Sequence, residues 1–258
     1  MSYVEHAPPP ALREHVACLW AADAPGGGTV LPDGCVDVVW TGGELVVAGA
    51  DTRAARGGSA AAPGPVRLGV RFRVGAAGAA LRLPAHELTD LRVPLDDLWP
   101  GGGEVAERVA TALDGDSDGD RAVAAALAEL SAALEARLRD AAPVDPLVRA
   151  AAVVLTDPRA RVAGVAHDAG VSQRHLLRRF RASIGYGPKT LACVLRLQRF
   201  LAAVRAGGSD PAWLAADTGY ADQSHLARDC AALAGATPGA LIAARRVPAG
   251  DTSLVSSA

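Results

Sequence analysis

The sequence contains very little lysine, methionine or aromatic side chain. Of 258 residues, one is methionine and 4% are aromatic. The only lysine is Lys189, so arginine carries nearly all of the positive charge. No apolar run reaches the roughly 18 residues of a membrane-spanning helix, and there is no signal peptide or lipidation motif. We therefore expect a soluble, cytoplasmic protein without membrane contact.

Cysteine is also scarce, and its spacing excludes two kinds of site. The four cysteines lie far apart, without a Cys-x-x-Cys pair: Cys18, Cys35, Cys193 and Cys230. We expect reduced, mostly buried thiols rather than a zinc site or a disulfide framework. Nothing resembles a nucleophilic triad, a nucleotide-binding loop or a catalytic acid/base pair. The sequence predicts no enzyme, no metal and no cofactor.

The chain does contain an internal duplication. Shifted by fifty residues, Ser172–Pro188 aligns with Asp222–Pro238, and seven of the seventeen positions are identical. The identical pairs are Gln173/Gln223, His175/His225, Leu176/Leu226, Arg178/Arg228, Ala182/Ala232, Gly185/Gly235 and Pro188/Pro238. Upstream, at an offset of 49, Ala163, Ala166, Asp168 and Gly170 match Ala212, Ala215, Asp217 and Gly219. The C-terminal region is therefore a tandem repeat of one structural unit.

Each copy has the pattern of two short helices joined by a tight turn. In the first copy, a helix over residues 162–168 is followed by Gly170, which allows positive φ, and by Ser172 as the cap of a second helix. Leu176 and Phe180 share the apolar face of that helix. The corresponding features of the second copy are Asp210–Pro211, Gly219, Asp222, Leu226 and Cys230. The pattern predicts two helix-turn-helix units, whose second helices are shaped to enter a DNA major groove.

A connecting helix is expected between the two copies. Residues 189–205 contain no helix breaker before Gly207, and 17 residues correspond to about 25 Å of helix. Successive major grooves on one face of DNA lie about 34 Å apart. A single chain is thus able to place both second helices in adjacent grooves.

Residues 145–246 resemble the DNA-binding domain of the AraC/XylS family of bacterial transcription regulators. The resemblance is carried by Val165-Ala166, Gly170-Val171-Ser172, Arg174-His175-Leu176, Gly185-Tyr186-Gly187-Pro188-Lys189, Arg196-Leu197-Gln198, Gly219–Arg228 and Gly235–Pro238. It implies binding to double-stranded promoter DNA, and to RNA polymerase if the protein is an activator. It also implies base contacts from Gln173, Arg174, Leu177 and Arg178, and from Gln223, Ser224, Ala227 and Arg228. We add Arg181 and Lys189 as expected DNA-binding residues.

The second unit departs from the family pattern at two positions. Cys230 replaces the usual aromatic residue, and Ala227 offers little hydrogen bonding. The second helix would then depend more on phosphate contacts or thymine methyl groups. A small-molecule-binding protein whose DNA-binding half is inactive remains an alternative.

The charge distribution favours DNA binding independently. Residues 145–246 contain 14 Arg and Lys against 7 Asp and Glu, whereas the whole chain carries a net charge of −2. The remainder therefore carries −9. A mildly acidic protein thus contains a basic module suited to phosphate binding.

Residues 1–100 are predicted to form a β-rich sensor or effector domain. Val36–Trp40 and Leu45–Ala50 have the pattern of a hairpin, and Val66–Val74 alternates apolar residues with Arg67, Arg71 and Arg73. This module resembles the sensor half of one AraC-type subgroup through Leu31–Asp37, Gly69–Arg73 and Glu87–Trp99. The resemblance implies a small, cupin-like β-barrel. The fold class is therefore α+β.

Two interpretations of this module's polar residues stay open. Asp33, Cys35, Asp37, Arg71 and Arg73 are candidate contacts for an unknown small-molecule effector, and the ordinary alternative is a solvated strand face with a core cysteine. A rival function is a metal- or thiol-dependent sensor or enzyme centred on Cys35, Asp37 and His86.

Residues 101–144 are predicted to be a helical linker. Helices are expected over residues 104–113 and 121–140, and the second has a stripe of Val123, Leu127, Leu130, Leu134 and Leu138. The stripe either pairs two subunits as a short coiled coil, which would make a homodimer, or packs against the β-rich module. Residues 247–258 are expected to be a flexible tail. The whole chain is interpreted as a DNA-binding transcription regulator, controlled by an effector or by dimerisation through its N-terminal half.

Overall fold

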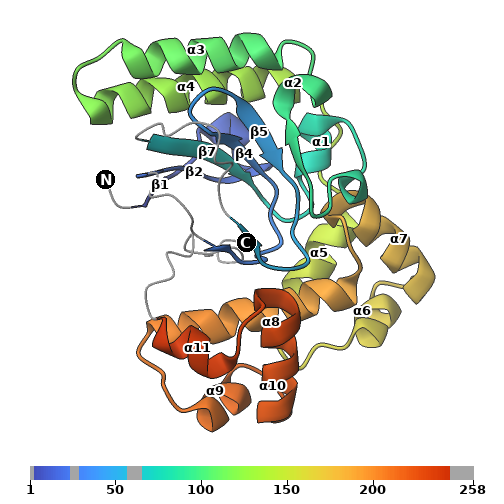
Figure 1. Ribbon diagram of the computed structural model, residues 1–258. Helices are drawn as coiled ribbons and strands as arrows, with labels where there is room; N and C mark the ends of the chain where they lie inside the picture. Colours follow the sequence, from blue (N-terminus) through green and yellow to red (C-terminus); the bar gives the residue numbers. More distant parts are fainter. Residues whose placement is uncertain (1–2, 24–28, 57–65, 245–258) are drawn as a thin grey trace.

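The computed structural model describes residues 3–23, 29–56 and 66–244. An N-terminal antiparallel sheet and a helical C-terminal region make up the chain, which confirms the predicted α+β class (Figure 1). The predicted tail over residues 247–258 lies outside the described residues.

The main sheet has six strands in the order β1-β2-β7-β4-β5-β8, and every neighbouring pair is antiparallel. Their bounds are Val4–His6 (β1), Val16–Asp23 (β2), Asp37–Trp40 (β4), Leu45–Ala48 (β5), Val66–Phe72 (β7) and Arg92–Pro94 (β8). A separate pair joins β3 (Thr29–Val30) to β6 (Ala55–Arg56). Four short helical segments complete this half: η1 (Pro10–Leu12), α1 (Ala77–Leu81), η2 (Ala85–Glu87) and α2 (Leu95–Leu98).

The sheet does not close into the small barrel that the sequence suggested. Within the described residues β1 and β8 are its two edges, and each is only 3 residues long. The apolar face that a barrel would enclose is instead covered by a helical hairpin, α3 (Gly102–Asp114) and α4 (Gly119–Leu138), which Figure 1 shows above the sheet. Helix-on-sheet packing therefore replaces closure of the sheet.

The apolar stripe of α4 is used inside the chain. Leu130 and Leu134 are 0% exposed, and Val123, Leu127 and Leu138 are also buried, because α4 packs on α3, β7 and η1. Asp118 caps this helix by accepting from the backbone N–H groups of Asp120 and Arg121. Of the two alternatives for the stripe, packing against the β-rich module is the one that the structure shows, and the face is not free to form a coiled coil.

The C-terminal half has the predicted repeat of short helices. It contains α5 (Pro146–Val154), α6 (Val162–Asp168), α7 (Gln173–Ile184), α8 (Pro188–Arg205), α9 (Pro211–Asp217), α10 (Gln223–Asp229), the π-helical η3 (Cys230–Ala234) and α11 (Pro238–Ala243). The caps match between the copies: Ser172 Oγ accepts from His175 N at 3.1 Å, and Asp222 Oδ1 accepts from His225 N at 2.7 Å. The turn glycines have φ of 65° at Gly170 and 88° at Gly219.

The β-rich half contacts both repeat units. Thr89 Oγ1 donates to Gly185 O at the end of α7 (3.1 Å), and Gln198 Nε2 of α8 donates to Pro32 O (2.6 Å). The backbone N–H of Ala54 donates to Leu233 O in η3 at 2.7 Å. The N-terminal module therefore holds α7, α8 and the second unit in one arrangement.

The paired glycines Gly185 and Gly235 allow this contact to be tested. Both end the second helix of their unit with positive φ, but a Cβ on Gly185 would lie 2.6 Å from Thr89 Oγ1, whereas a Cβ on Gly235 would meet no atom within 4 Å. Gly235→Ala should cost about 1–2 kcal/mol for left-handed backbone alone. Gly185→Ala should cost clearly more, because of the Thr89 contact and because its φ of 109° lies further from the left-handed helical region than the 63° of Gly235. The free energy of unfolding in urea measures both losses. Equal losses of stability in the two variants would show that Thr89 does not lie close enough to Gly185 to exclude a Cβ there.

Candidate nucleic-acid interface

The exposed face of α7 follows from what its other face buries. Leu176 and Phe180 are both 0% exposed, and they fix the rotation of the helix about its axis. The opposite face is exposed and carries the four predicted base-contacting residues, Gln173, Arg174, Leu177 and Arg178. Leu177 is 43% exposed, although leucine side chains are usually buried. An exposed apolar side chain among polar ones is suited to the methyl group of thymine.

The second unit repeats this arrangement position by position. Leu226 and Cys230 are 0% exposed, at the positions of Leu176 and Phe180. Gln223, Ser224, Ala227 and Arg228 are exposed, at the positions of the four candidate residues of α7. The duplication thus extends from the sequence to the side-chain exposure of both helices.

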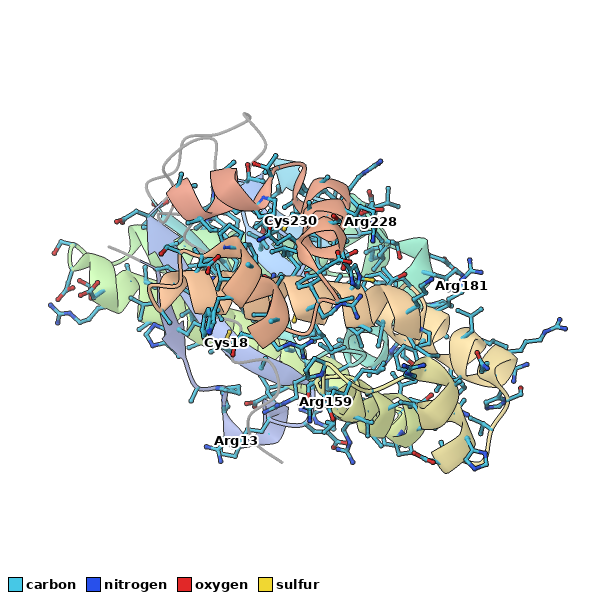
Figure 2. All side chains as sticks on the ribbon, turned by 90° about the horizontal axis from the view of Figure 1, so that it is seen from below. Arg13, Cys18, Arg159, Arg181, Arg228 and Cys230 are labelled. Atoms are coloured by element: carbon cyan, nitrogen blue, oxygen red, sulfur yellow. The ribbon has the colours of Figure 1, made fainter. Side chains whose placement is uncertain are left out.

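Two further predicted DNA-binding residues lie near the first unit. Arg181 is exposed in the last turn of α7, and Lys189 is exposed in the first turn of α8. Figure 2 shows Arg181 and Arg228 as side chains on different helices of the C-terminal half. All ten predicted DNA-binding residues are therefore open to a ligand.

The second unit has a smaller apolar residue and a polar contact beside it. α10 ends at Asp229 and continues as the π-helical segment that begins with Cys230, where the first unit has Phe180. Arg196 of α8 donates to Asp229 Oδ2 at 3.4 Å, and its guanidinium lies 5.7 Å from the centre of the Tyr220 ring. These contacts attach α10 to α8.

Helix α8 sets the separation of the two units. It has 18 residues, which corresponds to about 27 Å of helix. The helix widths add to this length, so the separation is suited to successive major grooves, which lie about 34 Å apart on one face of DNA.

A second polar cluster lies in the N-terminal sheet. The strand register places Cys18 of β2 and Asp37 of β4 opposite Arg71 of β7. Arg71 donates to both carboxylate oxygens of Asp37 at 3.2 Å, and its Nη2 lies 3.6 Å from Asp33 Oδ2. Its other guanidinium nitrogen lies 3.8 Å from Glu5 Oε1. The structure therefore brings together four of the five predicted effector residues, since Cys35 is buried in the same cluster.

The predicted basic outer face of β7 is wrong at Arg71, whereas Arg73 lies just after the end of the strand and is half-buried. Arg71 is only 9% exposed, and its guanidinium lies among the side chains of Asp37, Asp33, Glu5 and Tyr3. Arg73 is not part of the cluster, and its Nε donates to Arg13 O at 2.7 Å. One signal was present in the sequence: Gly69 lies inside the strand, where a glycine often marks the close approach of other groups. A Cβ at Gly69 would lie 2.5 Å from Val38 O and 3.0 Å from the Trp20 ring, so the glycine makes room for both.

The thiols of this cluster are kept protonated by their surroundings. Burial raises the pKa of Cys18 to about 12, and burial raises the pKa of Cys35 well above its ordinary value. A protonated thiol is a poor nucleophile and a poor metal ligand. His86 is exposed on η2, and within the described ranges no three His, Cys, Asp or Glu side chains are grouped so as to hold a metal ion. The geometry does not favour the rival metal or thiol site at Cys35, Asp37 and His86.

Comparison with known proteins gives separate matches for the two halves. Residues 165–244 match the family model of a helix-turn-helix domain, and residues 4–94 match that of a domain of unknown function (DUF6597). No curated protein sequence matches the chain.

In the helices of the described residues, no segment is long and apolar enough to span a membrane.

Solved structures of ToxT from Vibrio cholerae are similar to this chain. An apo ToxT variant is 13% identical, with 87% of this chain and 96% of that protein covered and a TM-score of 0.48. ToxT bound to (E)-4-(8-methylnaphthalen-1-yl)but-3-enoic acid is 9% identical, with 94% and 98% covered and a TM-score of 0.46.

Proposed function

We propose that this chain, whose C-terminal region carries an AraC-type helix-turn-helix domain, is a transcription regulator that binds double-stranded promoter DNA with both of its repeat units. The observation that supports this most is the matched exposure of α7 and α10. Two helices of one chain bury the same positions and expose the same positions, and α8 separates them by a length suited to neighbouring grooves.

In this proposal the exposed side chains divide into two roles. Gln173, Arg174 and Arg178 on α7, with Gln223, Ser224 and Arg228 on α10, donate to or accept from base edges, while Leu177 and Ala227 contact thymine methyl groups. Arg181 and Lys189 contact phosphates, which orient the protein without reading sequence.

We propose that the N-terminal module is a sensor for a small-molecule effector. Its buried cluster contains Arg71, paired with Asp37 and close to Asp33 and Glu5, and a polar ligand that pairs with these groups would compete with the existing ion pairs. The neighbouring loop connects this cluster to the DNA-binding half: Asp33 lies 3.6 Å from Arg71, and the adjacent Pro32 accepts from Gln198 of α8. A shift of this loop would change how α8 presents the two units to DNA.

The remaining parts of the proposal are a cytoplasmic location, a cupin-like ancestry for the sheet, and an RNA polymerase contact if the protein activates transcription. A homodimer, if formed, requires a surface other than the α4 stripe, since that stripe is buried.

The test is selection of binding sites by the intact chain from a pool of random DNA duplexes. We expect a bipartite site whose two parts lie about ten base pairs apart, since each unit reads one groove. A site with one part only would contradict binding by both units. A pool that gains no sequence preference would contradict the proposed function.

A further inference from the structure

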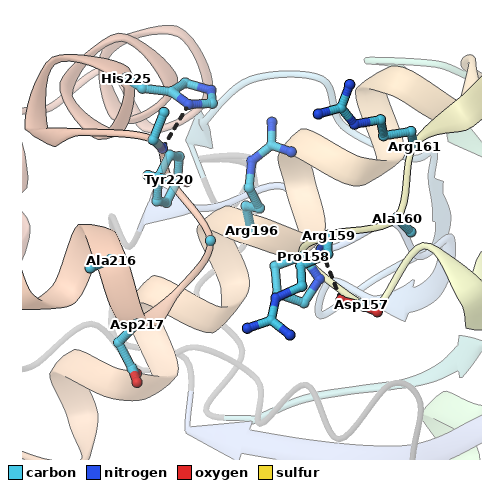
Figure 3. A pocket seen from close by; sticks show the side chains of 12 residues that line it. Asp157, Pro158, Arg159, Ala160, Arg161, Arg196, Ala216, Asp217, Tyr220 and His225 are labelled. Atoms are coloured by element: carbon cyan, nitrogen blue, oxygen red, sulfur yellow. Dashed lines mark hydrogen bonds between the residues drawn. The ribbon is translucent and has the colours of Figure 1, made fainter.

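A cleft of about 780 Å³ separates the two repeat units. One wall is the loop Asp157–Arg161 in front of α6, and the other is formed by the end of α9, the turn of the second unit and His225. Arg196 projects from α8 between the walls, as Figure 3 shows. None of the ten predicted DNA-binding residues lines this cleft, so it is a separate feature of the domain.

The cleft is richer in cations than in anions. Arg159, Arg161 and Arg196 line it, against the carboxylates of Asp157 and Asp217. Asp157 Oδ1 already accepts from the backbone N–H of Arg159 at 2.8 Å. Arg159 and Arg161 are exposed, and within the described part of the chain neither forms an ion pair. Two of the guanidinium groups that line the cleft therefore have no acidic partner in the part of the chain that the structure describes.

The inner part of the cleft also has unused hydrogen-bonding groups. Arg196 Nη2 donates to Asp229 Oδ2 at 3.4 Å and to Cys193 Sγ at 3.2 Å, but its Nε is buried without a partner among the described residues. The Tyr220 hydroxyl lacks a partner there as well, in a side chain that is only 4% exposed. Buried polar groups without partners are uncommon in folded proteins and call for an explanation, such as an ordered water or a bound ion.

Helix α8 fixes both walls of the cleft. Arg199 Nη1 donates to Thr156 O in front of the first wall, and Arg196 holds Asp229 behind the second. Burial, and then the positive charge of Arg196, lower the pKa of Arg199.

We infer that this cleft holds a segment of the DNA sugar-phosphate backbone between the two half-sites; the inference rests on the proposed function. When two helices occupy successive major grooves on one face, the protein surface between them faces the minor groove and its flanking phosphates. The cleft lies between the two units, and Figure 3 shows Arg161 and Arg196 extending on one side of it and Arg159 on the other. Guanidinium groups bind phosphate with paired hydrogen bonds. Arg159 and Arg161 are thus positioning residues that hold the duplex without reading its sequence.

The test compares the double variant Arg159→Ala/Arg161→Ala with Arg139→Ala, an exposed arginine outside the DNA-binding half. Affinity is titrated against salt on the selected duplex and on an unselected duplex. Each lost phosphate contact lowers the salt slope by about 0.9, so the double variant should lose about two units on both duplexes and bind at least about tenfold more weakly. In the random duplex pool, the double variant should select the same DNA sequence as the parent protein. A double variant with the slope of Arg139→Ala would overturn the inference.

A second arm locates the contact on the DNA. Neutral methylphosphonate linkages are placed between the two half-sites, or outside them, in the selected duplex. Linkages between the half-sites should weaken binding of the intact protein and leave the double variant unchanged. A loss only from outer linkages would overturn the inference. If the pool yields no preferred site, the proposed function fails, while the slopes on the unselected duplex still test the cleft.

Discussion

Arg71→Met is expected to lower the free energy of unfolding by about 3–5 kcal/mol at neutral pH. The substitution leaves the buried carboxylate of Asp37 without its bidentate partner, and removal of one member of a buried ion pair is costly in this range. Arg71 is 9% exposed, and its two bonds to Asp37 are each 3.2 Å long. Urea unfolding followed by circular dichroism measures the loss.

The pH dependence of this loss has a defined sign. Burial raises the pKa of Asp37 above its ordinary value even though Arg71 opposes the shift. Without Arg71 the pKa rises further, so the folded state binds more protons than the unfolded state at a pH between the two values. Stability then falls as pH rises through that window. Arg71→Met should therefore be less damaging at pH 5 than at pH 8.

Two variants serve as controls for Arg71. Arg67→Met changes a half-buried arginine of the same strand that has no ion pair in the described part of the chain, and it should cost little. Arg71→Met/Asp37→Asn also removes the unpaired carboxylate of Asp37. The double variant should therefore be more stable than Arg71→Met and should not show its pH dependence. If Arg67→Met costs as much as Arg71→Met, the ion pair does not stabilise the sheet.

Arg178→Ala and Arg228→Ala are each expected to lower affinity for the selected duplex by about 1–3 kcal/mol, if each arginine binds a base edge. The two residues lie on different helices, so their effects should add in the double variant. A titration of the selected duplex against one of scrambled sequence measures the effect. Neither side chain is needed for packing, because both are exposed, so the variants should unfold at the same urea concentration as the parent.

The scrambled duplex separates the two roles of an arginine. A base contact is lost only on the selected duplex, whereas a phosphate contact is lost equally on both. Equal losses for Arg228→Ala and unequal losses for Arg178→Ala would mean that the second unit binds phosphate only. The exposed Ala227 beside Arg228 has no hydrogen-bonding side chain, so α10 has fewer groups than α7 with which to bind base edges.

The helical half was predictable because its signals are local. Ser172 and Asp222 cap their helices as their positions indicated, and the turn glycines have the positive φ that their places in the repeat required. The apolar spacing at Leu176 and Phe180 also determined which residues of α7 are exposed. Short-range patterns of this kind do not depend on the rest of the chain.

The N-terminal half was less predictable because its outcome depends on contacts distant in sequence. Alternation on β7 identified the strand but suggested a solvated basic face, whereas Arg71 is buried and paired with Asp37 and Glu5 from other strands. The α4 stripe likewise fitted two partners, and only the arrangement of the sheet decided between them. The cleft at Arg159 and Arg196 joins a loop to a helix through the tertiary fold, and no sequence pattern marks it.

The central claim is that one chain reads two successive grooves at a separation fixed by α8. The most direct measurement is the affinity of the intact protein for its selected duplex before and after five base pairs are inserted between the two half-sites. Half a helical turn moves one half-site to the opposite face of the DNA, so affinity should fall at least about tenfold, to the level of a duplex with one half-site. Unchanged affinity after the insertion would contradict the account.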